Sequence, residues 1–380
     1  MVEWKKMWEV TTWDKKFSGV EKYMQPKVIK YYYYLANELA DLERLSGDIR
    51  ILYTTNKEAY TNSIDVEGTI SEGEVVTIPW GGNVNIQYYN GKFVTADNRI
   101  ATSNNTDYLN NKFLYYWMLS QKDEIAKMYR GAGIQHPSML SVLSMSIPIP
   151  SLEEQTRIVG ILDAFTSAID NLNEQIAQRR KQYEYYRDQL LDLEGKSGVE
   201  MKTLGEVGDV CMCKRIMKEQ TSENEEIPFF KIGTFGSQAD AFISRDLFEE
   251  YKSKYSYPKK GEILISASGT IGRSVVFDGE DAYYQDSNIV WIANDEKVVT
   301  NRYLYYFYQV ADWKVDGGTI KRLYNYNLKN TTIPLPPLSE QQRIVSILDT
   351  FEASIQNLEA QLSQREKQYE YYRNKLLTFE

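Results

Sequence analysis

Along two stretches of this chain, apolar residues recur at alternating steps of four and three. An average step of 3.5 residues is typical of the seam of a left-handed coiled coil. After Gly160 in the first stretch and Pro337 in the second, neither glycine nor proline interrupts the pattern. Each stretch therefore predicts a helix roughly 60 to 65 Å long, at about 1.5 Å per residue. The seam positions are Ile158, Leu162, Phe165, Ile169, Leu172, Ile176, Arg179, Tyr183, Tyr186, Leu190 and Leu193, and then Ile344, Leu348, Phe351, Ile355, Leu358, Leu362, Arg365, Tyr369, Tyr372, Leu376 and Phe379.

The two stretches are copies of one another. Residues 147–194 align with residues 333–380 without a gap, at an offset of 333 − 147 = 186, and about 29 of the 48 positions are identical. Because a helix cannot bury such a seam alone, we expect the copies to pair. Arg179 and Arg365 interrupt the seam at matching positions, where a charge fixes register at a cost in stability. In an antiparallel pair they would lie symmetrically about a pseudo-two-fold axis.

The segment before each helix repeats the same order of signals, namely two strand patterns, an aromatic helix and a glycine-led loop. In the first segment these lie at 49–56, 73–79, 109–129 and 131–146, and in the second at 227–236, 261–277, 301–313 and 317–332. The first segment also predicts helical or mixed structure at 27–45 and a hairpin turn at Asn90-Gly91.

This repetition predicts an α+β protein in which two α/β globular domains are separated by two long helices that form an antiparallel coiled coil. The expected boundaries are 1–146 for the first domain, 147–196 for the first helix, 197–332 for the second domain and 333–380 for the second helix. The helices are nearly identical and the globular segments differ. That contrast suggests one kind of partner bound twice and two different targets.

Charge and composition narrow the possible functions. The chain has 44 lysines and arginines against 53 acidic residues, a net charge of −9, which argues against a simple basic DNA-binding domain. Any contact with nucleic acid would need local basic surface, helped by a partner. No apolar run is long enough to span a membrane, and the first residues lack the apolar core of a secretion signal. The only cysteines, Cys211 and Cys213, are too close in sequence for an ordinary disulfide, which fits the cytoplasm.

No catalytic or metal-binding constellation stands out. Gly195-Lys196-Ser197 ends like a phosphate-binding loop, but Leu190 stands where the first glycine is required. The lone histidine, His136, has no nucleophile to activate, and one histidine makes a zinc site of the usual kind improbable. We therefore expect a chain that is not an enzyme.

Basic and amide residues in the glycine-led loops and in one lysine-rich stretch are candidate DNA contacts. Arginine pairs with guanine and glutamine with adenine in the major groove, whereas lysine suits phosphates. The alternative for each is an ordinary surface charge. The candidates are Arg130, Gln135, His136, Lys252, Lys254, Lys259, Lys260, Arg273, Lys321 and Arg322, with Lys15 and Lys16.

The repeated motif resembles the specificity subunit of type I restriction–modification enzymes. So does the alternation of two variable segments with two near-identical helices. The matching residues are Pro148, Pro150, Leu152, Glu154, Gln155, Arg157, Ile158 and Asp163, and then Pro334, Pro336, Leu338, Glu340, Gln341, Arg343, Ile344 and Asp349.

That resemblance implies that each globular domain is a target-recognition domain for one half of a split double-stranded DNA sequence, with the helices setting the gap. It also implies two methyltransferase subunits docked along the helices, with restriction subunits completing the enzyme. S-adenosylmethionine and ATP would belong to those partners, with no cofactor in this chain. We assign to the docking surface Glu154, Gln155, Arg157 and Tyr185 with their counterparts Glu340, Gln341, Arg343 and Tyr371. The competing hypothesis is a coiled-coil scaffold that does not recognise DNA.

Overall fold

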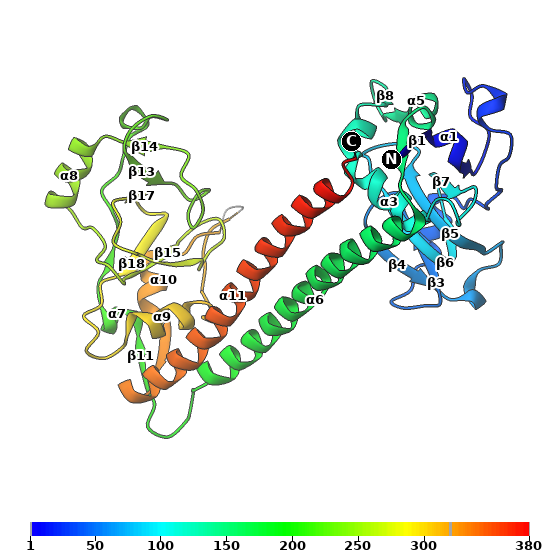
Figure 1. Ribbon diagram of the computed structural model, residues 1–380. Helices are drawn as coiled ribbons and strands as arrows, with labels where there is room; N and C mark the ends of the chain where they lie inside the picture. Colours follow the sequence, from blue (N-terminus) through cyan, green and yellow to red (C-terminus); the bar gives the residue numbers. More distant parts are fainter. Residues whose placement is uncertain (1, 319–320, 380) are drawn as a thin grey trace. The chain divides into compact units, whose positions relative to one another are not determined.

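The computed structural model describes residues 2–318 and 321–379 (Figure 1). The chain forms two compact units. Unit 1 comprises Met1–Asn173 and Gln361–Glu380, and unit 2 comprises Glu174–Ala360. Each unit contains one globular domain, the first half of one long helix and the second half of the other.

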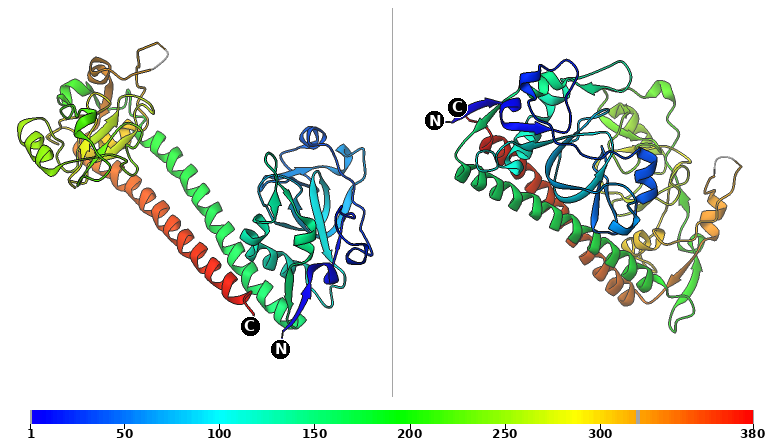
Figure 2. Two further views of the ribbon diagram at one scale, coloured as in Figure 1. Left: turned by 90° about the horizontal axis from the view of Figure 1, so that it is seen from above. Right: turned by 90° about the vertical axis from the view of Figure 1, so that its right-hand side faces the viewer.

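The two long helices are α6, Leu152–Leu191, and α11, Leu338–Leu376. Their directions are opposite within each unit (Figures 1 and 2). In unit 1 the Phe165 ring stacks on Tyr372, with centroids 5.4 Å apart, and in unit 2 Tyr186 stacks in the same way on Phe351 at 5.5 Å. These pairs are the same contact shifted by 186 residues, since 165 + 186 = 351 and 186 + 186 = 372. The predicted antiparallel coiled coil is confirmed.

The charged interruptions of the seam also match. The Arg179 guanidinium lies 5.9 Å from the centre of the Phe351 ring, and Arg365 lies 5.7 Å from that of Phe165. Each arginine therefore covers the aromatic ring of the opposite helix with its cation, a contact that is favourable at a partly solvated site.

Unit 1 is built on a six-stranded sheet in the order β2-β7-β5-β6-β3-β4. Only the β3–β6 pair is parallel. The strands are β2 Thr11–Trp13, β3 Ile49–Leu52, β4 Glu58–Thr61, β5 Ser71–Pro79, β6 Gln87–Thr95 and β7 Asn98–Ser103. The helices of this domain are α1 Met7–Val10, α2 Ala36–Leu42, α3 Asn111–Ser120, α4 Lys122–Ala126 and α5 Met139–Leu143, with the short 3-10 turns Lys22–Met24 and Ser63–Asp65.

Unit 2 has a four-stranded sheet in the order β12-β18-β15-β16 and a three-stranded sheet in the order β14-β13-β17. The strands are β12 Val210–Cys211, β13 Ile227–Phe230, β14 Phe242–Ile243, β15 Ile263–Ser266, β16 Ser274–Val276, β17 Tyr283–Tyr284 and β18 Ile289–Ile292. The helices are α7 Leu204–Val207, α8 Arg245–Lys254, α9 Asn301–Tyr308 and α10 Asn325–Asn330, with a 3-10 turn at Lys218–Gln220.

A short ribbon leads into each long helix. β1, Glu3–Lys6, pairs antiparallel with β10, Ser146–Ile149, and β11, Glu200–Thr203, pairs antiparallel with β19, Thr332–Leu335. The first strand of each ribbon ends in a matching helix cap, in which the Glu9 carboxylate accepts from the Lys6 N–H and Glu206 accepts from the Thr203 N–H. The repeat thus includes the start of each domain, which the sequence comparison had not aligned.

Two of three local expectations for the first domain were wrong. Asn90 and Gly91 do not form a turn, because they lie inside β6 and pair with Glu74 and Gly73 of β5. The helical or mixed structure expected at 27–45 is mixed, because α2 is helical and the stretch before it is extended with isolated bridges. The helix expected at 109–129 is broken at Gln121, whose ψ of 15° ends α3 before α4 begins.

Substitution of Leu162 tests how much the helix seam contributes to the stability of unit 1. This side chain is fully buried in the core that joins α6 to the domain. We expect Leu162→Ala to lower the free energy of unfolding by about 2–5 kcal/mol, because it removes buried apolar atoms and leaves a cavity. Calorimetry of the full chain measures the effect. The matched control is Leu152→Ala on the same helix, where the side chain is 37% exposed, and equal losses for both variants would contradict the packing.

Candidate nucleic-acid and partner interfaces

Three predicted DNA contacts of unit 1 lie on one exposed hairpin. It is formed by β8, Tyr129–Arg130, and β9, His136–Pro137, with Arg130 opposite His136. Arg130, Gln135 and His136 are all exposed. Gly131, at the turn, has a φ of +139°, and a Cβ there would lie 2.9 Å from the Ile134 carbonyl oxygen. The glycine therefore permits the tight turn that gathers these side chains.

The end of β5 holds this hairpin in place. The His136 Nδ1–H donates to the Trp80 carbonyl oxygen at 2.7 Å, and the two rings lie 5.3 Å apart. The Gly82 N–H donates to the Gln135 carbonyl oxygen at 3.0 Å. Because a carbonyl only accepts, the proton of a neutral His136 sits on Nδ1. Its Nε2 is then an acceptor, the complement of the exocyclic amino groups that adenine and cytosine present in the major groove.

Trp80 also joins the hairpin to a buried ion pair. The Arg99 guanidinium donates to Asp14 at 3.1 Å, with side-chain exposures of 4% and 0%, and stacks 4.6 Å from the centre of the Trp80 ring. The Tyr33 hydroxyl donates to the same carboxylate at 2.8 Å. Lys15 lies over the Tyr33 and Trp80 rings, and its pKa is lowered by burial and then by the neighbouring Arg99. A predicted lysine thus lies beside the hairpin, while Lys16 is simply exposed.

Unit 2 carries the same hairpin 186 residues later. The backbones of Asp316 and Arg322 form a β-bridge, as those of Arg130 and His136 do in unit 1. Arg322 forms a second backbone β-bridge with Ser268, just after β15. One Arg322 nitrogen, Nη2, donates to the Ser287 carbonyl oxygen at 2.8 Å and to Asn288 Oδ1 at 3.0 Å. Lys321 is exposed on the same loop. Thr319 and Ile320 lie outside the described residues.

The lysine-rich stretch does not join this hairpin. Lys252 pairs with Asp281 at 3.1 Å and Lys254 with Glu250 at 2.9 Å, both from α8. Lys259 and Lys260 are exposed in the turn that follows. Arg273 is exposed as well, and its Nη1 donates to the Phe235 carbonyl oxygen at 2.9 Å. The partners of Lys252 and Lys254 already compensate their charge.

Arg322 instead lines a cavity of about 530 Å³ with three cations that the sequence did not single out. Arg215 and Lys218 lie three residues apart in one segment, whereas Lys231 follows β13 and is separated from Lys218 by four glutamates in sequence. No local pattern links Lys231 to the other two. We refer to this space as the cationic cavity; it is lined by Arg215, Ile216, Met217, Lys218, Thr221, Phe229, Lys231, Gln285, Asp286, Ser287, Asn288 and Arg322.

Two of the predicted partner contacts repeat on each helix as an exposed ion pair. Arg157 meets Glu154 at 2.6 Å, and Arg343 meets Glu340 at 2.7 Å, through paired hydrogen bonds. Arginine lowers the pKa of each glutamate. Tyr185 and Tyr371 are 59% and 58% exposed. These matched, solvent-facing groups remain available to a partner.

Gln155 and Gln341 require a correction, because both are completely buried and cannot contact a partner. The Gln155 amide donates to the carbonyl oxygens of Tyr108 and Pro150, each at 2.9 Å, and accepts from the Asn110 N–H at 2.8 Å. Gln341 makes the same three bonds in unit 2, with the carbonyls of Val298 and Pro336 and the N–H of Thr300. Each glutamine fastens a long helix to the loop before the aromatic helix of its domain.

An aspartate of the repeated motif completes this attachment. Asp163 accepts from the Tyr116 hydroxyl at 2.6 Å and pairs with Lys112 at 2.7 Å. In unit 2 Asp349 accepts from the Tyr306 hydroxyl and from Arg302, both at 2.6 Å. Burial, with the aspartate bond next, raises the pKa of both tyrosines. The motif NKFLYY at 111–116, repeated as NRYLYY at 301–306, is the signal that could have revealed this contact.

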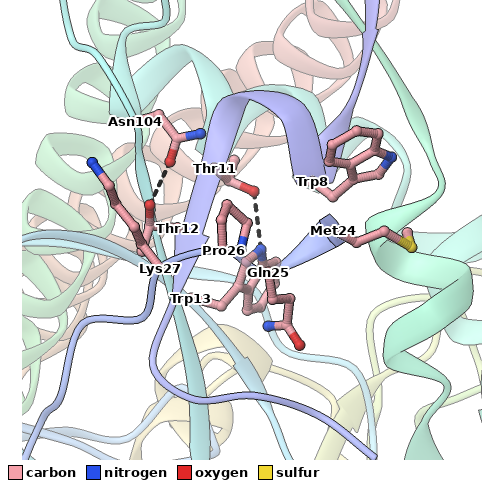
Figure 3. Close-up of a pocket in the computed structure, with 9 residues that line it drawn as sticks. All are labelled: Trp8, Thr11, Thr12, Trp13, Met24, Gln25, Pro26, Lys27 and Asn104. Atoms are coloured by element: carbon pink, nitrogen blue, oxygen red, sulfur yellow. Dashed lines mark hydrogen bonds between the residues drawn. The ribbon is translucent and has the colours of Figure 1, made fainter. Parts of the chain in front are cut away.

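A further pocket, of about 220 Å³, lies beside the N-terminal strands of unit 1 (Figure 3). In its wall the Trp13 indole N–H donates to Thr11 Oγ1 at 3.0 Å, and the Thr12 hydroxyl donates to Asn104. Lys27 is its only charged residue, and none of the predicted DNA contacts lines it. Within residues 2–318 and 321–379, no group of three or more histidine, cysteine or acidic side chains is placed to hold a metal ion. No helix of the described chain is both long and apolar enough to cross a membrane.

Comparison with known proteins identifies related chains. The family model of the type I restriction modification DNA specificity domain matches residues 27–179 and again 196–366. A putative type I restriction enzyme specificity subunit of Haemophilus influenzae is 48% identical over 354 residues, 88% of this chain and 89% of its own length. The EcoR124I/EcoR124II specificity subunit of Escherichia coli is 31% identical over 70% of each chain.

Solved structures share the fold. The S subunit of the type I restriction–modification system of M. genitalium superposes with a TM-score of 0.62 at 17% identity, covering 100% of this chain and 97% of that one. A chain from a study of complex assembly in the type I system superposes with a TM-score of 0.54 at 16% identity, covering 99% and 97%. At these identities the likeness concerns the fold.

Substitution of Gln155 distinguishes a structural role of this side chain from a role in binding a partner. We expect Gln155→Leu to lower the free energy of unfolding by about 1–3 kcal/mol, because the Asn110 N–H loses its buried acceptor. Arg157→Leu, two residues further along on the exposed face, should change it by no more than about 0.5 kcal/mol. Thermal denaturation of both variants checks this, and a Gln155 variant as stable as the parent would contradict the assignment.

Proposed function

Because this chain belongs to the family of type I restriction–modification DNA specificity subunits, we propose that each unit reads one half of a split DNA sequence. The observation that carries the proposal is the duplicated hairpin. Its backbone bridges recur at an offset of 186 residues, while its exposed side chains differ. A hairpin backbone that is repeated while its exposed side chains differ suits two sites that recognise different DNA sequences.

The residues at matching hairpin positions present different chemistry to DNA. Unit 1 offers Gln135 and the Nε2 of His136, and unit 2 offers Lys321 and Arg322 at the same places. A glutamine amide matches adenine in the major groove, whereas lysine and arginine match guanine or phosphate. The two half-sequences are therefore expected to be unrelated.

The long helices would set the distance between the half-sequences. Each is continuous, with 40 residues in α6 and 39 in α11, or about 60 Å at 1.5 Å per residue. The buried glutamine and the aspartate–tyrosine contact fasten each globular domain to its helix. A domain that cannot slide along its helix presents its hairpin at a defined position.

The duplicated outer surface of the helices would bind two methyltransferase subunits. Its repeated features are the Glu154–Arg157 and Glu340–Arg343 pairs and the exposed Tyr185 and Tyr371. Two copies of one surface on one chain suit two copies of one partner. Restriction subunits would complete the assembly, and the partners would hold S-adenosylmethionine and ATP. This chain would then contribute recognition and no catalytic group.

Mapping of methylated adenines tests this function. In cells expressing the chain with its methyltransferase partner, we expect methylation at one split motif. The double variant Gln135→Ala/His136→Ala should alter only one half of that motif, and Lys321→Ala only the other half. Lys92→Ala, an exposed lysine of β6 outside the hairpin and outside the candidate DNA contacts, is the matched control. Methylation without any motif, or variants that alter both halves together, would favour the scaffold hypothesis instead.

A further inference from the structure

We propose that the cationic cavity of unit 2 binds phosphates of the DNA backbone and supplies most of the salt-dependent affinity of that unit. This inference rests on the proposed function and extends it to a site outside the hairpin. The cavity has a volume of about 530 Å³, and Arg322 at its edge belongs to the hairpin itself. A strand passing the hairpin would therefore meet the cavity.

The charge of the lining favours an anion. Arg215, Lys218, Lys231 and Arg322 contribute four positive charges and Asp286 the single negative one, so the lining carries 4 − 1 = +3. The whole chain carries −9. Gathering cations in one recess of an acidic protein costs Coulomb energy unless an anion offsets it. Phosphodiester groups, spaced along a strand, are anions that occupy such a recess in succession.

The partners of these cations leave part of that charge uncompensated. Asp286 is engaged by Arg215 Nε at 2.9 Å. Arg322 donates through Nη2 to the neutral oxygens of Ser287 and Asn288. Within residues 2–318 and 321–379 it forms no ion pair with a carboxylate, so its positive charge is not compensated there. Lys231 pairs at 2.8 Å with Asp240, a half-exposed residue that does not line the cavity. Lys218 is exposed on a 3-10 turn at the rim.

The backbone of the cavity wall is held in an unfavourable conformation. Ser287 has a φ of +59°, in the left-handed region that non-glycine residues rarely adopt. Its carbonyl oxygen accepts from Arg322, and its hydroxyl donates to Asp286 at 3.2 Å. Strain of this kind persists where surrounding contacts enforce it, and it concentrates at binding sites. Arg322, a cation of the cavity, makes one of the contacts at this residue.

Unit 1 holds its hairpin differently. The matching position to Arg322 is His136, which contacts Trp80, and the nearby Arg99 is neutralised by the buried carboxylate of Asp14. Lys15 lies over the Tyr33 and Trp80 rings and Arg130 is exposed on the hairpin, so two cations remain there, fewer than the four that line the cationic cavity. The two units would therefore contribute unequally to electrostatic affinity, with the larger share in unit 2.

The test compares two double variants of equal charge. Lys218→Gln/Lys231→Gln removes two cations of the cavity, and Lys202→Gln/Lys297→Gln removes two lysines of the same unit that lie outside the cavity and outside the candidate DNA contacts. Binding of the full chain, with its methyltransferase partner, to a target duplex is measured over a range of salt concentrations. Each lost phosphate contact should reduce the slope of log affinity against log salt by about 0.9. We expect a slope shallower by about 1.8 for the cavity variant and an unchanged slope for the control.

A cavity variant with the parental slope, or a control variant that becomes equally shallow, would overturn the inference. The methylated motif should stay the same in the cavity variant, because phosphate contacts carry no base information. The failure of the proposed function would look different. In that case the unmodified chain would show no preferred sequence, and the salt slope on any duplex would still report on the cavity.

Discussion

Each long helix of this protein carries an apolar seam that it cannot bury alone, and the rest of the structure depends on how that seam is covered. In each unit, half of α6 and half of α11 supply the cover for one another, with Phe165 on Tyr372 and Tyr186 on Phe351. Since the two helices are copies, the same pair of positions meets in both units. In unit 1 α6 supplies the phenylalanine and α11 the tyrosine, and in unit 2 the reverse holds. An antiparallel arrangement is the one in which this exchange occurs, because it pairs the start of each copy with the end of the other.

A second constraint joins each globular domain to this helix pair. The buried amides of Gln155 and Gln341 would be costly without partners, and each satisfies its hydrogen bonds only when the helix start, the preceding proline and the neighbouring loop are all in place. Asp163 and Asp349 add a contact about two helical turns further along. The domains differ in sheet order and in sequence, yet they attach through the same groups. Such an attachment allows the exposed hairpins to diverge without disturbing the support.

The long helices could be predicted because their signal is local and periodic, and their pairing because the two copies match. The hairpins could be predicted as glycine-led loops. Asn90-Gly91 was misread, since the pairing of β5 with β6 outweighed a strong local turn preference. Gln155 was misread because a repeated polar residue looks the same in sequence whether it faces a partner or a buried carbonyl. The cationic cavity was missed because only the fold brings Lys231 and Arg322 to Arg215 and Lys218.

The central claim is that the paired helices determine the distance between two DNA half-sequences. The most direct measurement is to insert one heptad near the middle of each helix, which preserves the seam and adds about 10 Å to each. The methylated motif is then mapped in cells that express this variant with its methyltransferase partner. The account predicts that both half-sequences are retained and that the gap between them becomes longer. A gap of unchanged length would contradict it.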